Sequence, residues 1–175
     1  MSSAASDVYK RQLQPDGMLL ANMLGGRSLN ELRGCIAEAE IEICGGISPR
    51  CMPMADIREL GSLLQRAGFA LPVADAELVT VTYPDMFRLM ADIKAMGGQN
   101  CLFGRISHFT PRAVFMRAAA LYKQKFSNSG GQIKATVELI TLTGWAPDTS
   151  QPQPLRPGSA ANRLAEALGT TETPL

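Results

Sequence analysis

Apolar residues along this chain follow two periods, and together they predict an α/β fold. An apolar run that follows a Pro-Asp-Gly turn and stops at Gly25-Gly26 is typical of a buried strand over residues 19–23. Residues 78–82 are rich in β-branched side chains, which predicts a second strand. Apolar and polar side chains alternate over residues 133–143, which predicts a third strand centred on 137–141. Helical periods occupy the long intervals between these strands, so we predict one layered sheet with flanking helices.

Start and stop signals divide the intervals into four predicted helices. We expect a capping box at Ser28-Leu-Asn-Glu31, a second helix over 55–67 that ends before Gly68, Pro84 as the first residue of a third helix, and a Thr110-Pro111 start for the fourth. The glycine pairs 45–46 and 97–98 end the first and third helices. A two-proline loop over 46–53 separates the first two.

Composition sets both ends of the chain apart from this fold. Residues 2–12 match, position by position, a one-frame translation of a widely used transposase sequencing adaptor, so we interpret residues 1–12 as an artefact. Proline and small polar residues dominate from residue 148 onward, which predicts a flexible tail over 148–175 with a marginal helix near 160–168. The domain is therefore expected over residues 13–147.

Charge and cysteine usage narrow the classes of function. The net charge is +1, with 46% hydrophobic and 19% charged residues, which argues against a nucleic-acid or membrane-surface protein. No apolar run reaches the roughly 20 residues that span a bilayer. The four cysteines form no Cys-x-x-Cys pair and His108 is the one histidine, so we expect no metal site, reduced thiols and a cytoplasmic location.

Several short motifs occur in a fixed order. They are Leu24-Gly-Gly26, Leu29-x-x-Leu-Arg33, Gly46-Ile-Ser-Pro49, Leu60-Gly-x-Leu-Leu64, Arg66-Ala-Gly-Phe69, Tyr83-Pro-x-Met86, Met90-x-Asp-Ile-Lys-x-Met-Gly97 and Gly144-Trp145. Their succession resembles class I S-adenosylmethionine (SAM)-dependent methyltransferases. The resemblance is to the malonyl-carrier-protein methyltransferases of biotin synthesis and to a mitochondrial complex I assembly factor associated with protein arginine hydroxylation. The second group fits better at Ser48-Pro49 and Tyr83-Pro-Asp-Met86.

This resemblance implies the C-terminal half of a Rossmann-like sheet, with strands five, seven and six and the last strand antiparallel between the other two. The Gly-rich cofactor loop and the ribose-binding acid of that family have no counterpart here, because only twelve residues precede the first matching segment. We therefore expect SAM in a full-length parent and none in this fragment, which should be inactive. An uncovered sheet edge should favour poor solubility or dimers.

Eight residues are candidate substrate-side groups, and no catalytic residue is assigned. Gly25, Gly26 and Ser28 follow the first strand, where ligands bind in open α/β sheets, although the glycines could simply turn the chain. Ser48, Arg50 and Met52 could form a lid, with Arg50 either pairing with a ligand carboxylate or phosphate or remaining solvated. Met86 and Met90, with Phe87 and Met96, could line a substrate wall or pack in the core.

Other side chains give no catalytic pattern. His108 has no visible partner, and Glu77, Asp85 and Asp92 lack the spacing of paired carboxylates. Three functions for the parent stay open: a SAM-dependent enzyme acting on a protein or in complex I assembly, a non-catalytic assembly protein on the same fold, and a carrier-protein methyltransferase.

Overall fold

A computed structural model describes residues 12–153 and 168–169, and it confirms the α/β class. In chain order the elements are β1 (Met18–Leu24), α2 (Asn30–Cys44), α3 (Ile57–Arg66), β2 (Ala70–Tyr83), α4 (Met86–Ala95), α5 (Arg112–Phe126) and β3 (Ile133–Trp145). All three predicted strands and all four predicted helices are present. The adaptor-like residues 1–11 and most of the predicted tail and its helix, 154–167 and 170–175, lie outside the described residues.

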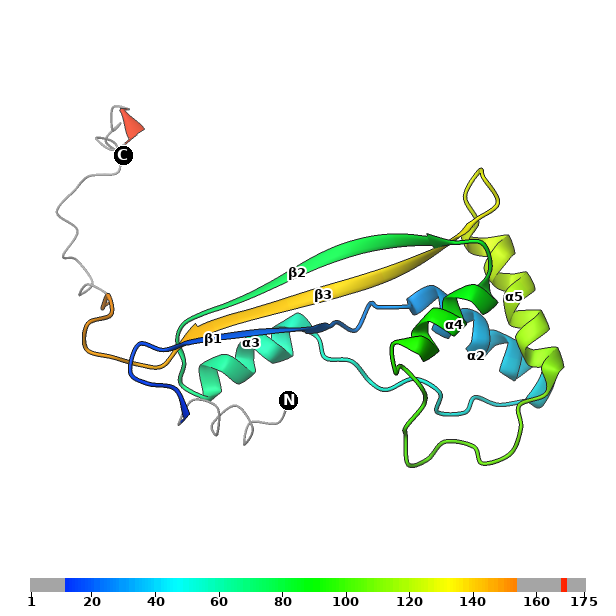
Figure 1. The fold of residues 1–175 in the computed structure, drawn as a ribbon, viewed down its shortest axis with the longest axis horizontal. Helices are drawn as coiled ribbons and strands as arrows, with labels where there is room; N and C mark the ends of the chain where they lie inside the picture. The colour runs from blue at the N-terminus through cyan, green and yellow to red at the C-terminus, as the bar shows by residue number, and fades with distance from the viewer. Residues whose placement is uncertain (1–11, 154–167, 170–175) are drawn as a thin grey trace, which may run out of the picture.

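The three strands form one sheet with the order β1-β3-β2 (Figure 1). β3 is antiparallel to both neighbours: Leu24 lies opposite Leu139, and Tyr83 lies opposite Ile133. β1 and β2 are therefore parallel to each other, and their carboxyl ends point to the same end of the sheet. The predicted placement of the last strand between the other two is confirmed.

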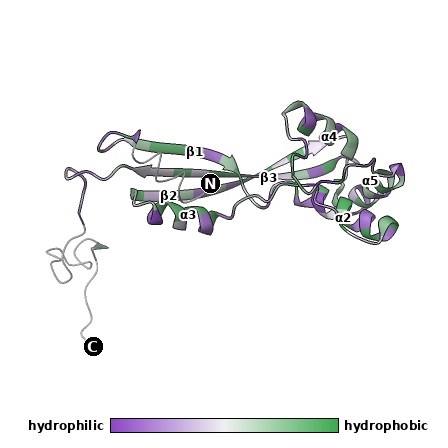
Figure 2. Cartoon of the chain, turned by 90° about the horizontal axis from the view of Figure 1, so that it is seen from below, coloured by the Kyte–Doolittle hydropathy of each residue, from purple (hydrophilic) through white to green (hydrophobic). Residues whose placement is uncertain are grey.

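Two hydrophobic cores lie at opposite ends of this long sheet (Figures 1 and 2). At one end, Leu60 and Leu64 of α3 pack on Ile140 and Leu142 of β3. At the carboxyl end of β1 and β2, helices α2, α4 and α5 pack together over the start of β3, with Tyr122 fully buried among them. We call these three helices the cap.

The predicted capping box at Ser28 is wrong. Helix α2 begins at Asn30, after Leu29 in a left-handed conformation with φ of 54°. The Ser28 hydroxyl is bound to the backbone of Glu138, and the Glu31 carboxylate accepts hydrogen bonds from the backbone N–H and the hydroxyl of Thr136. Both capping groups are used by β3, so tertiary contacts displaced the local pattern.

Two other predicted helix starts shift by one or two residues. Asp85, not Pro84, precedes α4, and its carboxylate caps the helix by accepting the Arg88 N–H at 2.9 Å. Pro111 lies before α5, which begins at Arg112, and no side chain caps that end. The Thr110 hydroxyl accepts a hydrogen bond from Arg50 instead.

One face of the sheet is uncovered along β1. Met18, Leu20 and Leu24 point to this face and are 51%, 62% and 48% exposed. Val73 of β2, on the same face, is also exposed. Among the described residues, the outer edge of β1 pairs with no strand.

An exposed apolar face beside an open strand edge favours association. We therefore expect the chain, in size-exclusion chromatography with light scattering, to elute as dimers or larger species at micromolar concentration. Replacing Leu20 with lysine should shift it toward monomer, because a charge on an edge strand opposes edge pairing. A monodisperse unmodified monomer would contradict this prediction.

The first residues of the predicted tail contact the domain. Gln151 is buried, and its amide donates to the Asp16 carboxylate at 2.8 Å and to the Ala146 carbonyl at 2.9 Å. These bonds join the chain after β3 to the turn that precedes β1.

Candidate functional site

The turn that follows β1 lies where the sequence places a substrate-side site. Its five successive backbone N–H groups are all used within the chain. Gly25 and Arg27 donate to Glu138, Gly26 to Ala55, Ser28 to Gly25 and Leu29 to Thr136. A glycine turn that cradles an anion needs backbone donors that point at the ligand. This turn has none left, so it is built to hold β1, β3 and the 51–55 segment together.

Gly25 is required by a close approach of Glu138. A Cβ atom at position 25 would lie 2.6 Å from Cδ and 2.7 Å from Cγ of that glutamate. One carboxylate oxygen of Glu138 accepts the Arg27 N–H at 2.9 Å. The pattern at Gly25 therefore reflects packing against β3 as well as a turn.

Glu138 and Glu31 are buried acids that the sequence pattern does not single out as site residues. Glu138 is 7% exposed and Glu31 is 8% exposed. The one signal for Glu138 is a lone acid inside an otherwise apolar and β-branched strand. The local pattern places Glu31 in a helix cap, and its contact with Thr136, 105 positions away, is visible only in the fold.

The predicted lid residues Ser48 and Arg50 both bind Glu40 of α2. Arg50 Nη2 lies 2.5 Å from Glu40 Oε1, and Ser48 donates to the same carboxylate through its hydroxyl and its backbone N–H. Burial alone would raise the pKa of Glu40, but the hydrogen bonds from Arg50 and Ser48 outweigh it and lower this pKa to about 2. The arginine is therefore committed to a partner inside the chain.

Arg50 also joins two loops of the cap. Its Nη2 donates to Thr110 at 2.9 Å, and its guanidinium lies over the Phe115 ring, 5.9 Å from the centroid. Asn100 donates to the Pro49 carbonyl at 2.9 Å. The loop between α2 and α3 and the loop between α4 and α5 thus lie side by side, held to helices α2 and α5.

The predicted methionine wall is divided between core and surface. Met86 is buried in the cap core and Met90 packs at its margin, while Phe87 and Met96 are exposed. Met52 is exposed, and its sulfur lies 3.8 Å from the Cys101 thiol. The structure therefore does not bring these methionines together on one wall, and their contact with a substrate stays a prediction.

Candidate catalytic and metal groups stay dispersed. His108 is exposed, and the part of the chain that the structure describes holds no group of three His, Cys, Asp or Glu side chains placed for a metal ion. Cys35 is buried, which raises its pKa, while Cys44, Cys51 and Cys101 are exposed free thiols. Over residues 12–153, each helix is too short or too polar to cross a bilayer.

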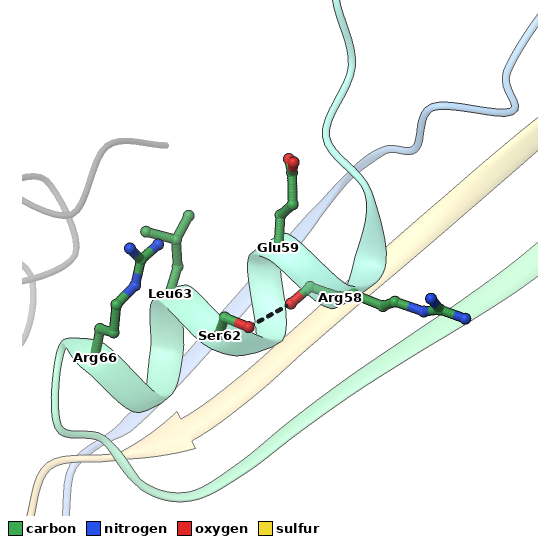
Figure 3. Close-up of a pocket in the computed structure, with 5 residues that line it drawn as sticks. All are labelled: Arg58, Glu59, Ser62, Leu63 and Arg66. Carbon is green, nitrogen blue, oxygen red and sulfur yellow. Dashed lines mark hydrogen bonds between the residues drawn. The ribbon is translucent and has the colours of Figure 1, made fainter.

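A hollow lies on α3 (Figure 3), at the opposite end of the sheet from the cap (Figure 1). Its lining comes from one helix: Arg58, Glu59, Ser62, Leu63 and Arg66. The Ser62 hydroxyl donates a hydrogen bond to the Arg58 carbonyl in the preceding turn of the helix. All described side chains that line the hollow come from this one helix, so no polar groups from different elements converge on it. We therefore do not assign a ligand-binding site to it.

Comparison with known proteins defines the class. The chain is 39% identical to arginine-hydroxylase NDUFAF5 of Dictyostelium discoideum over 163 residues, which are 93% of this chain and 37% of that protein. It is 41% identical to the rat NDUFAF5 over 161 residues, 92% of this chain and 47% of that protein. It is 33% identical to the malonyl-(acyl-carrier protein) O-methyltransferase of Xylella fastidiosa over 144 residues, 82% of this chain and 46% of that protein.

These similarities relate the chain to proteins of a methyltransferase family. Within that class, the chain is homologous to the NDUFAF5 arginine hydroxylases and, at lower identity, to the malonyl-carrier-protein methyltransferases. The chain spans less than half the length of each of these three relatives. No family model matches it. Among solved structures, the YcgJ protein of Bacillus subtilis is similar over 83% of this chain and 58% of the YcgJ chain, with 13% sequence identity and a TM-score of 0.45.

SAM, the cofactor that this class implies, does not fit the residues that the structure describes. The glycine turn after β1 has no spare backbone donor, and the acid beside it, Glu138, sits against Gly25 and binds the Arg27 N–H. No other glycine pair begins a helix after a parallel strand in this part of the chain. We therefore derive no catalytic step through SAM for these residues.

Proposed function

We propose that this chain supplies the substrate-side part of a SAM-dependent enzyme that modifies a protein, of the NDUFAF5 type, and that it is inactive alone. The observation that carries the proposal is the 38–41% identity to the NDUFAF5 proteins over 88–93% of the chain. Arginine hydroxylation is the activity that those relatives are named for. The name of the other group describes methylation of a carrier protein, so both relatives point to a protein substrate.

The arrangement of the cap supports a substrate-side role. Helices α2, α4 and α5 cluster at the carboxyl ends of the parallel strands β1 and β2 (Figure 1). Ligands of open α/β sheets bind at that end. The Glu40–Arg50 pair holds the α2–α3 loop against α2, and the bond from Arg50 to Thr110 holds the α4–α5 loop beside it. These contacts fix the position of both loops at this end of the sheet.

Loss of a binding half should remove activity altogether. Catalysis of group transfer depends chiefly on holding two reactants in position, so a chain that binds one reactant loses most of the rate enhancement.

The alternative is a non-catalytic assembly protein on the same fold, and the uncovered face of β1 favours it because that face offers a docking surface. A carrier-protein methyltransferase is the third possibility.

The test is a SAM titration of two proteins. Coding sequence upstream of this chain would be recovered, and the longer protein and the present chain would each be titrated with SAM by calorimetry. We expect saturable heat for the longer protein and none for the present chain. A longer protein that binds no SAM would overturn the enzyme proposal in favour of assembly, and SAM binding by the present chain would overturn its proposed inactivity.

Mass spectrometry of the substrate then identifies the reaction. Peptides and a malonyl carrier protein would be incubated with the longer protein, SAM, dissolved oxygen and a two-electron reductant. A hydroxylase should add one oxygen atom to arginine while the other is reduced to water, and a carrier-protein methyltransferase should transfer the SAM methyl group to the malonyl carboxylate. The compartment is a separate proposal: we expect a cytoplasmic protein, whereas the NDUFAF5 relatives are named as mitochondrial. Fractionation of cells that express the longer protein at native level distinguishes the two.

A further inference from the structure

The two loops of the cap together form an exposed apolar surface, which we call the cap-loop surface. Phe103 and Phe109 of the α4–α5 loop are 106% and 99% exposed, which is the exposure of a side chain that touches nothing. Ile47 and Met52 of the neighbouring loop are 65% and 56% exposed. Large apolar side chains gathered on one surface are the usual mark of an interaction site, whereas single ones are not.

The two loops contact each other, so the exposed apolar side chains that they carry lie on neighbouring segments. Asn100 bonds to Pro49, the Cys101 thiol lies against Met52, and Gly104 lies beside the Pro49 ring. Arg50, anchored on Glu40, ties the far end of the α4–α5 loop through Thr110. Rigid presentation lowers the entropy cost of binding a partner.

This surface also carries positive charge with no neighbouring acid in the sequence. Residues 43–55 and 93–137 contain no Asp or Glu. Arg105 and Arg112 have no ion-pair partner among residues 12–153. The nearby acid, Glu40, is buried and neutralised by Arg50. The surface is therefore locally cationic although the whole chain is nearly neutral.

We propose that the cap-loop surface binds a protein segment that presents acidic side chains beside apolar ones. Phe103 and Phe109 would anchor it, and Arg105 and Arg112 would pair with its carboxylates. Aromatic anchors and arginines are the residues that dominate protein interfaces. The proposal rests on the proposed function only for the protein nature of the partner, and binding here requires no SAM.

Other occupants fit the charges less well. A symmetric dimer through this surface would bring each arginine close to its own copy, which costs free energy by like-charge repulsion. An anionic membrane is recognised by clusters of roughly four to eight basic residues, more than these loops supply. Single-stranded nucleic acid prefers stacked aromatics along a continuous basic groove, and Ile47 and Met52 interrupt such a track.

The test uses the complete chain and a labelled synthetic peptide. The peptide forms an amphipathic helix with Leu and Phe on one face and Asp and Glu beside them, and its twin carries Asn and Gln in place of the acids. Fluorescence anisotropy is expected to show saturable binding of the acidic peptide, at least about tenfold weaker binding of the twin, and weakening with added salt. Equal binding of the two peptides would overturn the proposed charge recognition.

Matched variants locate the binding surface. Phe103→Ser with Phe109→Ser, and separately Arg105→Glu with Arg112→Glu, should each raise the Kd by about tenfold or more. The controls are Val73→Ser on the exposed face of β2 and Arg58→Glu on α3, which should leave the Kd unchanged. Because the replaced loop side chains are exposed, the melting temperature should also stay the same.

Three outcomes would assign the surface to another occupant and overturn the proposal. The loop variants could bind the acidic peptide as the parent chain does. The phenylalanine variants could instead abolish binding to phosphatidylserine vesicles or to oligo-uridine, with the peptide unbound. In light scattering, they could convert a dimer to a monomer. Each outcome can be told from a failure of the proposed function, which is judged by SAM binding and product mass.

Discussion

Replacing Arg50 with methionine is expected to destabilise the chain by about 3 kcal/mol near neutral pH. The substitution leaves the Glu40 carboxylate, 5% exposed, with hydrogen bonds from Ser48 alone. An unpaired buried charge is costly, whereas the methionine side chain keeps most of the apolar contact that the arginine stem makes. Urea unfolding followed by circular dichroism measures the difference in free energy of unfolding.

The pH dependence separates loss of the ion pair from loss of packing. The pKa of Glu40 is lowered to about 2 in the folded protein, from an ordinary value of 4.5. Its contribution to stability is therefore complete above about pH 4.5 and is lost as the pH falls toward 2. In the methionine variant burial should raise this pKa above 4.5 instead, so the stability difference between the two proteins should start to shrink above pH 4.5 and keep shrinking as the pH falls toward 2.

Two further variants make this prediction specific. Arg50→Lys keeps a charge but not the forked geometry, so it should lose less than the methionine variant. Arg58→Met, at an exposed position of α3, should change stability by less than about 0.5 kcal/mol. A stability loss for Arg50→Met that stays constant from pH 7 to about pH 3 would contradict the ion-pair explanation.

Gly25→Ala is expected to destabilise the chain by about 2 kcal/mol, although alanine is normally harmless outside special backbone conformations. The added Cβ would collide with Cγ and Cδ of Glu138, a β3 residue whose carboxylate accepts the Arg27 N–H of the turn after β1. The strands or the glutamate must move, and either movement weakens the turn that joins β1 to the cap. Thermal and urea unfolding of the variant measure the loss.

A control and a second substitution test the collision directly. Gly34 lies within α2, and a Cβ atom added there would meet nothing within 4 Å, so Gly34→Ala should instead stabilise the chain by about 0.5–1 kcal/mol. The double variant Gly25→Ala with Glu138→Ala should be more stable than Gly25→Ala alone, because the clash is removed. Additive losses in the double variant would show that Gly25 is needed for another reason.

Local patterns were sufficient for the elements of the fold. Period and turn residues predicted all three strands and all four helices, and the resemblance placed β3 between β1 and β2. Helix ends were less well predicted. Ser28 and Thr110 looked like caps, but both hydroxyls bond to residues far along the chain. A capping pattern describes only the competition among neighbouring residues, and a distant backbone or guanidinium group can displace it.

The candidate site shows the same division. Gly25, Gly26 and Ser28 were placed at the correct end of the first strand, because a strand followed by glycines indicates that position. Their hydrogen-bond partners, however, come from β3 and from the 51–55 segment. Likewise, the sequence left Arg50 either pairing with a ligand carboxylate or phosphate or remaining solvated, and only the fold showed that its partner is Glu40 of the same chain.

Periodicity and motif order are properties of the chain, so they were enough to predict the class of fold, the order of the elements and the resemblance to a methyltransferase family. Which polar groups are still free to bind a ligand became visible only in the folded chain. Glu31, Glu40 and Glu138 are buried and used inside the chain, while Phe103 and Phe109 lie fully exposed near Arg105 and Arg112, which have no ion-pair partner among the described residues. Burial and hydrogen-bond partners depend on contacts between distant residues, and no local pattern contains them.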